Sequence, residues 1–176
     1  MTRLMKIALC VAAVSALASP AFAQSSATQS TTGTTKIIQP LTLAKNSDLA
    51  FGSVVKPNSA TNTVAIDASS GSRSVTGGGD AALAPSTSSR ATYTVSGEGG
   101  QTFSISTPTS FDMQRQGGSE TITVALTQSA ATGSISGSVG ATGTASFGVG
   151  GTIVNITDAT ATGTYTGSFV VTVTYN

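Results

Sequence analysis

Very few residues in this sequence have the types and spacing that catalysis needs. Ser53-Val54-Val55-Lys56 matches the Ser-x-x-Lys pattern, in which a serine acts as the nucleophile of a penicillin-binding hydrolase. That pattern requires a serine at the start of a helix, whereas Ser53 falls in a predicted strand. Among the 24 serines after residue 23, about one chance match is expected, so we interpret this match as fortuitous.

Three other patterns also lack the context that their chemistry requires. Gly148-Val149-Gly150-Gly151 begins like a dinucleotide-binding loop, but Ile153 stands at the third glycine position and no helix is predicted after it. We interpret this segment as a glycine bulge in a bent strand. Asn155-Ile156-Thr157 is a glycosylation site only in a eukaryotic secretory pathway. The aspartates lack the Asp-x-Asp-x-Asp spacing of a calcium loop. They are scattered singly, at Asp48, Asp67, Asp80, Asp112 and Asp158.

The composition excludes most of the remaining chemistry. The 176 residues include no His, no Trp and one Cys, so there is no imidazole base and no His-ligated metal. Lys and Arg number 8 against 7 Asp and Glu, which leaves no basic surface for nucleic acid. We therefore expect no catalytic residue, no metal site, no cofactor and no nucleic-acid partner, and a structural or adhesive role.

Residues 1–23 have the features of a cleavable signal peptide. Arg3 and Lys6 precede the apolar run 7–18, and small residues occupy the end of the segment before a cleavage site after Ala23. The apolar run is shorter than the roughly 20 residues that cross a bilayer as a helix, so we expect no stable membrane span. The only cysteine, Cys10, lies within this segment, so the exported chain is predicted to lack disulfides.

The remainder of the sequence is predicted to be all-β. Residues 24–35 are polar and are predicted to be a flexible segment, and residues 36–176 a single domain. Short apolar alternations of period two separate clusters of Gly, Ser, Asn and Pro, which predicts an immunoglobulin-like antiparallel β-sandwich of nine strands. The Gly-rich stretch 133–143 is interpreted as a long loop. The predicted strands are 36–43, 49–55, 61–67, 72–76, 91–96, 102–107, 120–127, 144–154 and 164–176.

The high content of hydroxyl residues fits this architecture. Residues 24–176 contain 24 Ser and 29 Thr, many of them interleaved with apolar residues, as in the strand around Ile122, Val124 and Leu126. Thr suits a half-buried strand because its β-branched side chain packs on a pleated surface while its hydroxyl stays in water. The sequence therefore predicts strands with one apolar face and one face covered with hydroxyl groups.

The C-terminal segment 163–176 alternates strictly and is predicted to be one long strand. It resembles the C-terminal signature of chaperone-usher pilus subunits, which has a penultimate aromatic residue, apolar residues alternating before it and a glycine fourteen residues from the end. Any terminal sandwich strand would also alternate. The matching positions, which we predict to form a strand-pairing or chaperone-binding edge, are Gly163, Phe169, Val171, Val173 and Tyr175.

A broader resemblance covers nearly all of the exported chain. The segments 49–55, 93–105, 147–154 and 163–176, in this order, resemble the DUF4402 family of exported bacterial proteins, which are similar to spore-coat-U-like and fimbrial subunits. The resemblance implies a pilin-like sandwich in the periplasm, at the cell surface or outside a Gram-negative bacterium. It implies no catalytic residues.

Besides an enzyme, which the composition disfavours, two functions remain open at this point. The first is a non-enzymatic subunit of a fimbria-like or coat-like surface assembly, which self-assembles or binds a periplasmic chaperone by β-augmentation. In that case the donor strand would begin at Gln24, although 24–35 has one apolar residue, Ala27, and Pro40 interrupts the apolar residues that follow. The alternative is a monomeric exported binding or adhesion module with its own complete sandwich.

Overall fold

The computed structural model describes residues 25–176, so the predicted signal peptide and Gln24 lie outside the described residues. The chain divides into two units, residues 1–36 and residues 37–176. In the first unit, residues 25–36 form no helix or strand, and every side chain is exposed. All strands belong to the second unit, residues 37–176, which is described below.

This domain is all-β, with no helix anywhere in residues 25–176. It has thirteen strands, of which the longest is β11. They are β1 Thr42–Ser47, β2 Val54–Val55, β3 Asn62–Ile66, β4 Arg73–Gly77, β5 Ala82–Leu83, β6 Ala91–Glu98, β7 Thr102–Ser106, β8 Ser110–Arg115, β9 Thr121–Gln128, β10 Thr132–Ser134, β11 Thr142–Ile156, β12 Tyr165–Thr166 and β13 Thr172–Tyr175.

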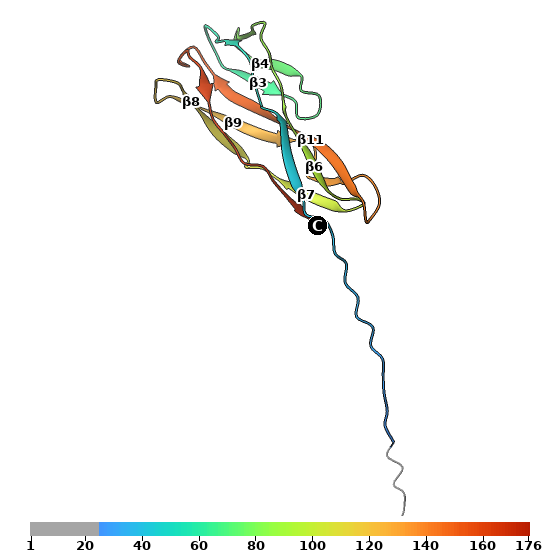
Figure 1. Ribbon diagram of the computed structural model, residues 1–176. Coiled ribbons are helices and arrows are strands. Elements are labelled where there is room, and N and C mark those ends of the chain that lie inside the picture. The colour runs from blue at the N-terminus through green and yellow to red at the C-terminus, as the bar shows by residue number, and fades with distance from the viewer. Residues whose placement is uncertain (1–24) are drawn as a thin grey trace, which may run out of the picture. The chain divides into compact units, whose positions relative to one another are not determined.

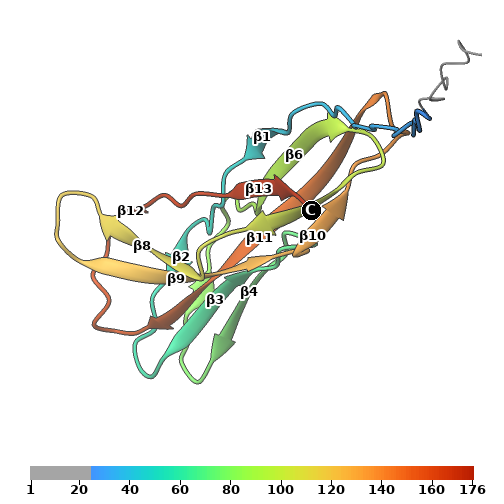
Figure 2. The same cartoon turned by 90° about the horizontal axis from the view of Figure 1, so that it is seen from below.

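The strands form one large curled antiparallel sheet and two small ones (Figures 1 and 2). In the large sheet the strand order is β1-β6-β11-β9-β8-β12, and β3 joins β11 to β4. The second sheet has the order β10-β7-β13, and β2 pairs with β5 alone. The predicted all-β antiparallel sandwich is therefore confirmed.

Strand β11 connects the two halves of the core. Its first half pairs with β6, and its second half pairs with β9 on one side and β3 on the other. Phe147 and Val149 lie in a first apolar cluster beneath the three-stranded sheet, whereas Ile153 and Ile156 lie in a second cluster with residues of β3 and β9. Both clusters therefore depend on this single strand.

The glycines of β11 serve close packing and do not form a bulge, so the sequence-based interpretation of Gly148–Gly151 was wrong. Pairing with β6 and β9 continues through this segment without a shift. A Cβ atom at Gly150 would lie 2.2 Å from the carbonyl oxygen of Ile66, and one at Gly148 would lie 2.3 Å from that of Ala68. The register shift of β11 comes later, between Ile153 and Ile156.

Several predicted strand boundaries need correction. Strands β5, β8 and β10 were not predicted, and Thr132–Ser134 together with the start of β11 replaces part of the loop expected at 133–143. The sequence does not predict β8 because its inward residues, Phe111 and Met113, have no β-branched side chain. The first predicted strand, 36–43, begins instead at Thr42, after Pro40, which has no N–H for a ladder.

The long C-terminal strand predicted for 164–176 is interrupted. Tyr165–Thr166 pairs with β8 in the large sheet, and Thr172–Tyr175 pairs with β7 in the small sheet. Residues 167–171 between them belong to no strand. The segment is interrupted because it passes from the edge of one sheet to the edge of the other, and one ladder cannot follow both.

The alternation of apolar and hydroxyl residues along the strands is confirmed. In β6, Ala91, Tyr93 and Val95 are buried and alternate with more exposed Thr and Ser side chains. In β9, Val124 is fully buried between exposed Thr123 and Ala125. The Ser and Thr content is therefore largely the outer face of the sheets.

Adding a methyl group at Gly150 should destabilise the domain. In Gly150→Ala, the new Cβ would collide with backbone atoms of Ile66 and Ala68, which cannot move without shifting β3. Overpacking of this kind costs about 1–3 kcal/mol. We expect that loss in the free energy of unfolding, measured by urea titration with far-UV circular dichroism. Gly33→Ala, which has nothing within 4 Å, is the matched control and should leave the value unchanged.

Acid should destabilise the domain through three surface carboxylates. Hydrogen bonds from the backbone and hydroxyl of Ser70 and the backbone of Ser69 lower the pKa of Asp67. Asn58 lowers the pKa of Asp80, and Arg115 lowers that of Glu120. Because the unfolded chain then binds protons more tightly, stability is complete above the unfolded pKa values and falls as the pH drops below about 4.

The pH dependence can be assigned to Asp67 by comparing melting temperatures at pH 7 and pH 3. Asp67→Asn should lose less stability on acidification than the wild type, because one of the three groups no longer titrates. Asp158→Asn is the control, since no hydrogen bond to its carboxylate is found in residues 25–176. An equal acid-induced loss in the wild type and Asp67→Asn would contradict this assignment.

Candidate functional site

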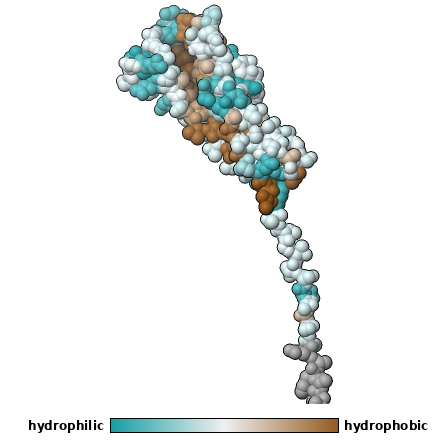
Figure 3. All heavy atoms as spheres, in the orientation of Figure 1, coloured by the Kyte–Doolittle hydropathy of each residue, from teal (hydrophilic) through white to brown (hydrophobic). Residues whose placement is uncertain are grey.

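A strip of half-buried apolar side chains lies between two sheet edges on one side of the domain. All of these residues pack against the first core cluster, yet none of them is fully covered. Figure 3 shows an apolar band on the face where β1 and the C-terminal segment lie in Figure 1. We call this set the apolar strip; its members are Leu41, Leu43, Phe169, Val171, Val173 and Tyr175.

The strip is flanked by strands whose outer edges are unpaired. β1 is the last strand of the large sheet on this side, and β13 is an edge of the small sheet. No pairing joins β1 to β13 within residues 25–176. The segment 167–171 makes no backbone hydrogen bond in this part of the chain, and Val170 is 75% exposed. Such edges offer free N–H and C=O groups to another strand.

One end of the strip is closed by hydrogen bonds that converge on Gln39. The hydroxyl of Tyr175 accepts a hydrogen bond from the backbone N–H of Glu98 at 2.8 Å and donates one to the carbonyl of Gln39, also at 2.8 Å. Thr142 donates its hydroxyl to the Gln39 side chain. We call Gln39, Glu98 and Tyr175 the Gln39 clasp. These residues connect the segment just before β1 with the ends of β6 and β13.

Glu98 is a buried charged residue in the clasp, with only 2% of its surface exposed. Its carboxylate accepts hydrogen bonds from the backbone N–H of Gln39 at 3.3 Å and from that of Gly140. A buried carboxylate needs such partners, because an unpaired one is costly. Side chains therefore satisfy the backbone of Gln39 where a neighbouring strand would otherwise do so.

The absence of a side chain at Gly97 makes room for the ring of Tyr175 beside the Gln39 clasp. A Cβ atom at Gly97 would lie 2.4 Å from the Tyr175 hydroxyl and 3.0 Å from Leu41. Because Gly97 has no side chain, the Tyr175 hydroxyl can reach the backbone N–H of Glu98. Sequence reasoning singled out Tyr175 but missed Glu98 and Gln39; the available signal was a lone acid between two glycines, Gly97 and Gly99, in an uncharged segment.

The structure brings four of the five predicted edge residues together. Phe169, Val171, Val173 and Tyr175 share one side of the C-terminal segment and pack on the first cluster. The ring of Phe169 also lies 5.0 Å, between centroids, from that of Phe111 on β8. Gly163 lies apart from them, beside Arg115, where a Cβ atom would come within 2.9 Å of that side chain.

The residues considered for catalysis do not converge. The Lys56 ammonium donates to the carbonyls of Asp158 and Thr160, at 2.5 and 3.4 Å, and Ser53 lies outside any strand, just before β2. Residues 25–176 contain no group of three or more His, Cys, Asp or Glu side chains placed to hold a metal ion. In the same residues, no helix is long and apolar enough to span a membrane.

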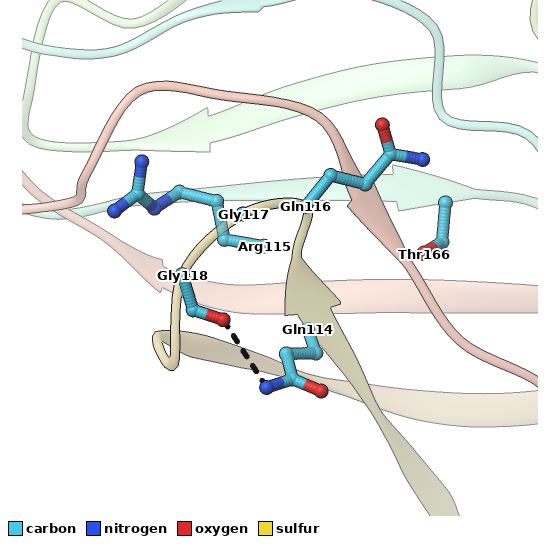
Figure 4. Close-up of a pocket in the computed structure, with 6 residues that line it drawn as sticks. All are labelled: Gln114, Arg115, Gln116, Gly117, Gly118 and Thr166. Atoms are coloured by element: carbon cyan, nitrogen blue, oxygen red, sulfur yellow. Dashed lines mark hydrogen bonds between the residues drawn. The ribbon is translucent and has the colours of Figure 1, made fainter.

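A polar hollow of about 490 Å³ lies at the turn between β8 and β9 (Figure 4). The side chain of Gln114 donates a hydrogen bond to the carbonyl of Gly118 at 3.2 Å, and Arg115 pairs with Glu120 at 2.8 Å. In Figure 4 the side chains of Gln114, Arg115 and Gln116 diverge and do not point at a common centre. The hollow is formed by this turn together with Thr166 of β12, without convergent polar groups.

The family to which this chain belongs follows from its match to a known protein family. The family described as Domain of unknown function (DUF4402) matches residues 41–175. The chain belongs to the DUF4402 family. The match begins at Leu41 and ends at Tyr175, so it includes both sides of the apolar strip. Searches of the curated proteins and of the solved structures found no match.

Removal of one oxygen atom should open the Gln39 clasp of this DUF4402 domain. Tyr175→Phe leaves the Glu98 N–H and the Gln39 carbonyl without their partner, which should cost about 1–3 kcal/mol. The free energy of unfolding from urea titration measures this loss. Tyr165→Phe removes one hydroxyl that makes a single hydrogen bond, to Ala161, and is the control. Equal losses in the two variants would show that the two hydrogen bonds of Tyr175 stabilise the domain no more than the single one of Tyr165.

Proposed function

We propose that this protein is a non-enzymatic, exported structural subunit of a fimbria-like or coat-like surface assembly held together by β-strand pairing. Under this proposal residues 1–23 direct export and are removed. A periplasmic chaperone or a second subunit then adds a strand along the apolar strip. The assembly lies at the surface of, or outside, a Gram-negative cell.

The observation that carries the proposal is the incomplete cover of the apolar strip beside unpaired backbone. Leu41 and Leu43 lie on one side, and Phe169, Val171 and Val173 lie on the other; all are half-buried and face the core. A strand placed between β1 and the C-terminal segment could bond to either edge while its alternate side chains cover the cluster. This combination gives both affinity, from main-chain bonds, and register, from side-chain pockets.

The N-terminal segment of another copy is the proposed strand. Residues 25–36 are exposed and form no regular structure, and Ile37 is 89% exposed. Pro40, which would interrupt a donor strand, lies beyond the point where Gln39 is held by the clasp. The donor would therefore end before Pro40, and because adjacent side chains of a strand point to opposite faces, one of Ile37 and Ile38 would face the cluster.

A charge in the strip should prevent assembly. In Val171→Lys, an ammonium group would replace a half-buried methyl pair on the surface that the incoming strand covers. We expect multimers of the wild-type chain purified from periplasm, seen by size-exclusion chromatography with light scattering, and monomers of this variant. Val170→Lys is the matched control, because Val170 is the neighbouring residue and is 75% exposed. It should assemble like the wild type.

Deletion of residues 24–38 tests whether this segment is a donor strand for another copy or a core strand of its own domain. If this segment serves another copy, the shortened chain should fold with an unchanged melting temperature and fail to form multimers by itself. Loss of folding would place the segment in its own domain. A wild-type chain that is folded and monomeric at every concentration would overturn the proposal and favour the alternative, a monomeric binding or adhesion module.

A further inference from the structure

The large sheet divides at the end of the domain that carries the β8–β9 turn. Pairing between β9 and β11 ends at Val124 and Ile153, and β11 next pairs with β3 at Ile156. Val154 and Asn155 therefore pair with neither neighbour. Asn155 adopts a φ of 63°, and both side chains are exposed. A bulge of this kind redirects side chains and is common beside binding sites.

A hollow of about 460 Å³ occupies the space between the diverging strands. Its base includes Ile156, which belongs to the second core cluster and makes the base apolar. The loop after β11 forms a wall that ends at Tyr165, whose hydroxyl is fixed by a hydrogen bond of 2.8 Å to the carbonyl of Ala161. The volume lies in the range of roughly 300–1,000 Å³ that is typical of ligand sites.

The rim of this hollow carries polar groups without partners. Asn155 and Thr121 are both lining residues of the hollow, and neither side chain makes a hydrogen bond to any residue in 25–176. The amide can donate two hydrogen bonds and accept others, and the hydroxyl can do both. The rim thus presents several free donors and acceptors above an apolar base.

The charges near the rim cancel. Glu120 is the acid among the lining residues, and Arg115 holds its carboxylate with two hydrogen bonds of 2.8 Å. This pair lowers the pKa of Glu120, so the carboxylate remains ionised and accepting at neutral pH. No lining residue of the hollow is a cation. An anionic ligand would therefore find no positive partner at the hollow itself.

From this geometry we propose that the hollow between β9 and β11 is a binding site for an uncharged saccharide. A sugar ring has an apolar C–H face for Ile156, and hydroxyl groups that can both donate to and accept from Asn155 and Thr121. An extended polypeptide fits less well, because the strands close again at Val124 and Ile153 and block its path. This site is independent of the apolar strip and of strand pairing.

Saturation-transfer NMR on residues 24–176 tests the site. The probes are methyl glycosides of glucose, galactose, mannose and N-acetylglucosamine, with sialyllactose as the charged comparison. We expect at least one uncharged glycoside to bind and sialyllactose not to bind. Asn155→Gly, which suits a positive φ, and Thr121→Val should each weaken that binding by about 3- to 10-fold, as expected for one lost hydrogen bond.

A matched control and two outcomes decide the matter. Thr127→Val changes an exposed threonine of the same strand, away from the hollow, and should leave the affinity unchanged. Melting temperatures confirm that all three variants are folded. The proposal is overturned if no uncharged glycoside binds, and equally if binding is the same in Asn155→Gly, Thr121→Val and the wild type.

Discussion

The close approach of β3 and the following turn to β11 is the contact on which the rest of the domain depends. The carbonyl oxygens of Ile66 and Ala68 occupy space that side chains of β11 would otherwise fill. Gly148 and Gly150 have no side chains and therefore leave this space free. Because β11 also pairs with β6 and β9, this contact holds the two apolar clusters in one structure. Its length of 15 residues allows one strand to serve both clusters.

The two ends of the sandwich that β11 connects differ in what they leave uncovered. At one end β1 and β13 remain as unpaired edges over the first cluster, and the Gln39 clasp joins them through side chains. At the other end β11 leaves β9, and a hollow with free polar groups opens between them. The surface proposed for assembly thus lies over the first cluster, and the site proposed for a saccharide lies beside the second.

The parts of the fold that the sequence predicted are those that depend on local pattern. The alternation in β6, β7 and β9 was sufficient to predict each strand and its buried face. β8 was missed because Phe111 and Met113 lack β-branching, and the strand forms through pairing with β9 and β12. In the same way, Tyr175 was predicted as an edge residue, but its partners Glu98 and Gln39 lie 77 and 136 positions away.

The sequence by itself determined that this chain is an all-β domain with hydroxyl groups on the outer faces of its strands, because period-two alternation is a property of neighbouring residues. It also determined the limited chemistry of the domain, since residue types do not depend on folding. Only the tertiary structure decided that the C-terminal segment serves two sheets, that the glycines of β11 make room for β3, and which apolar side chains stay half-covered. Those features depend on contacts between distant segments, which a local pattern does not record.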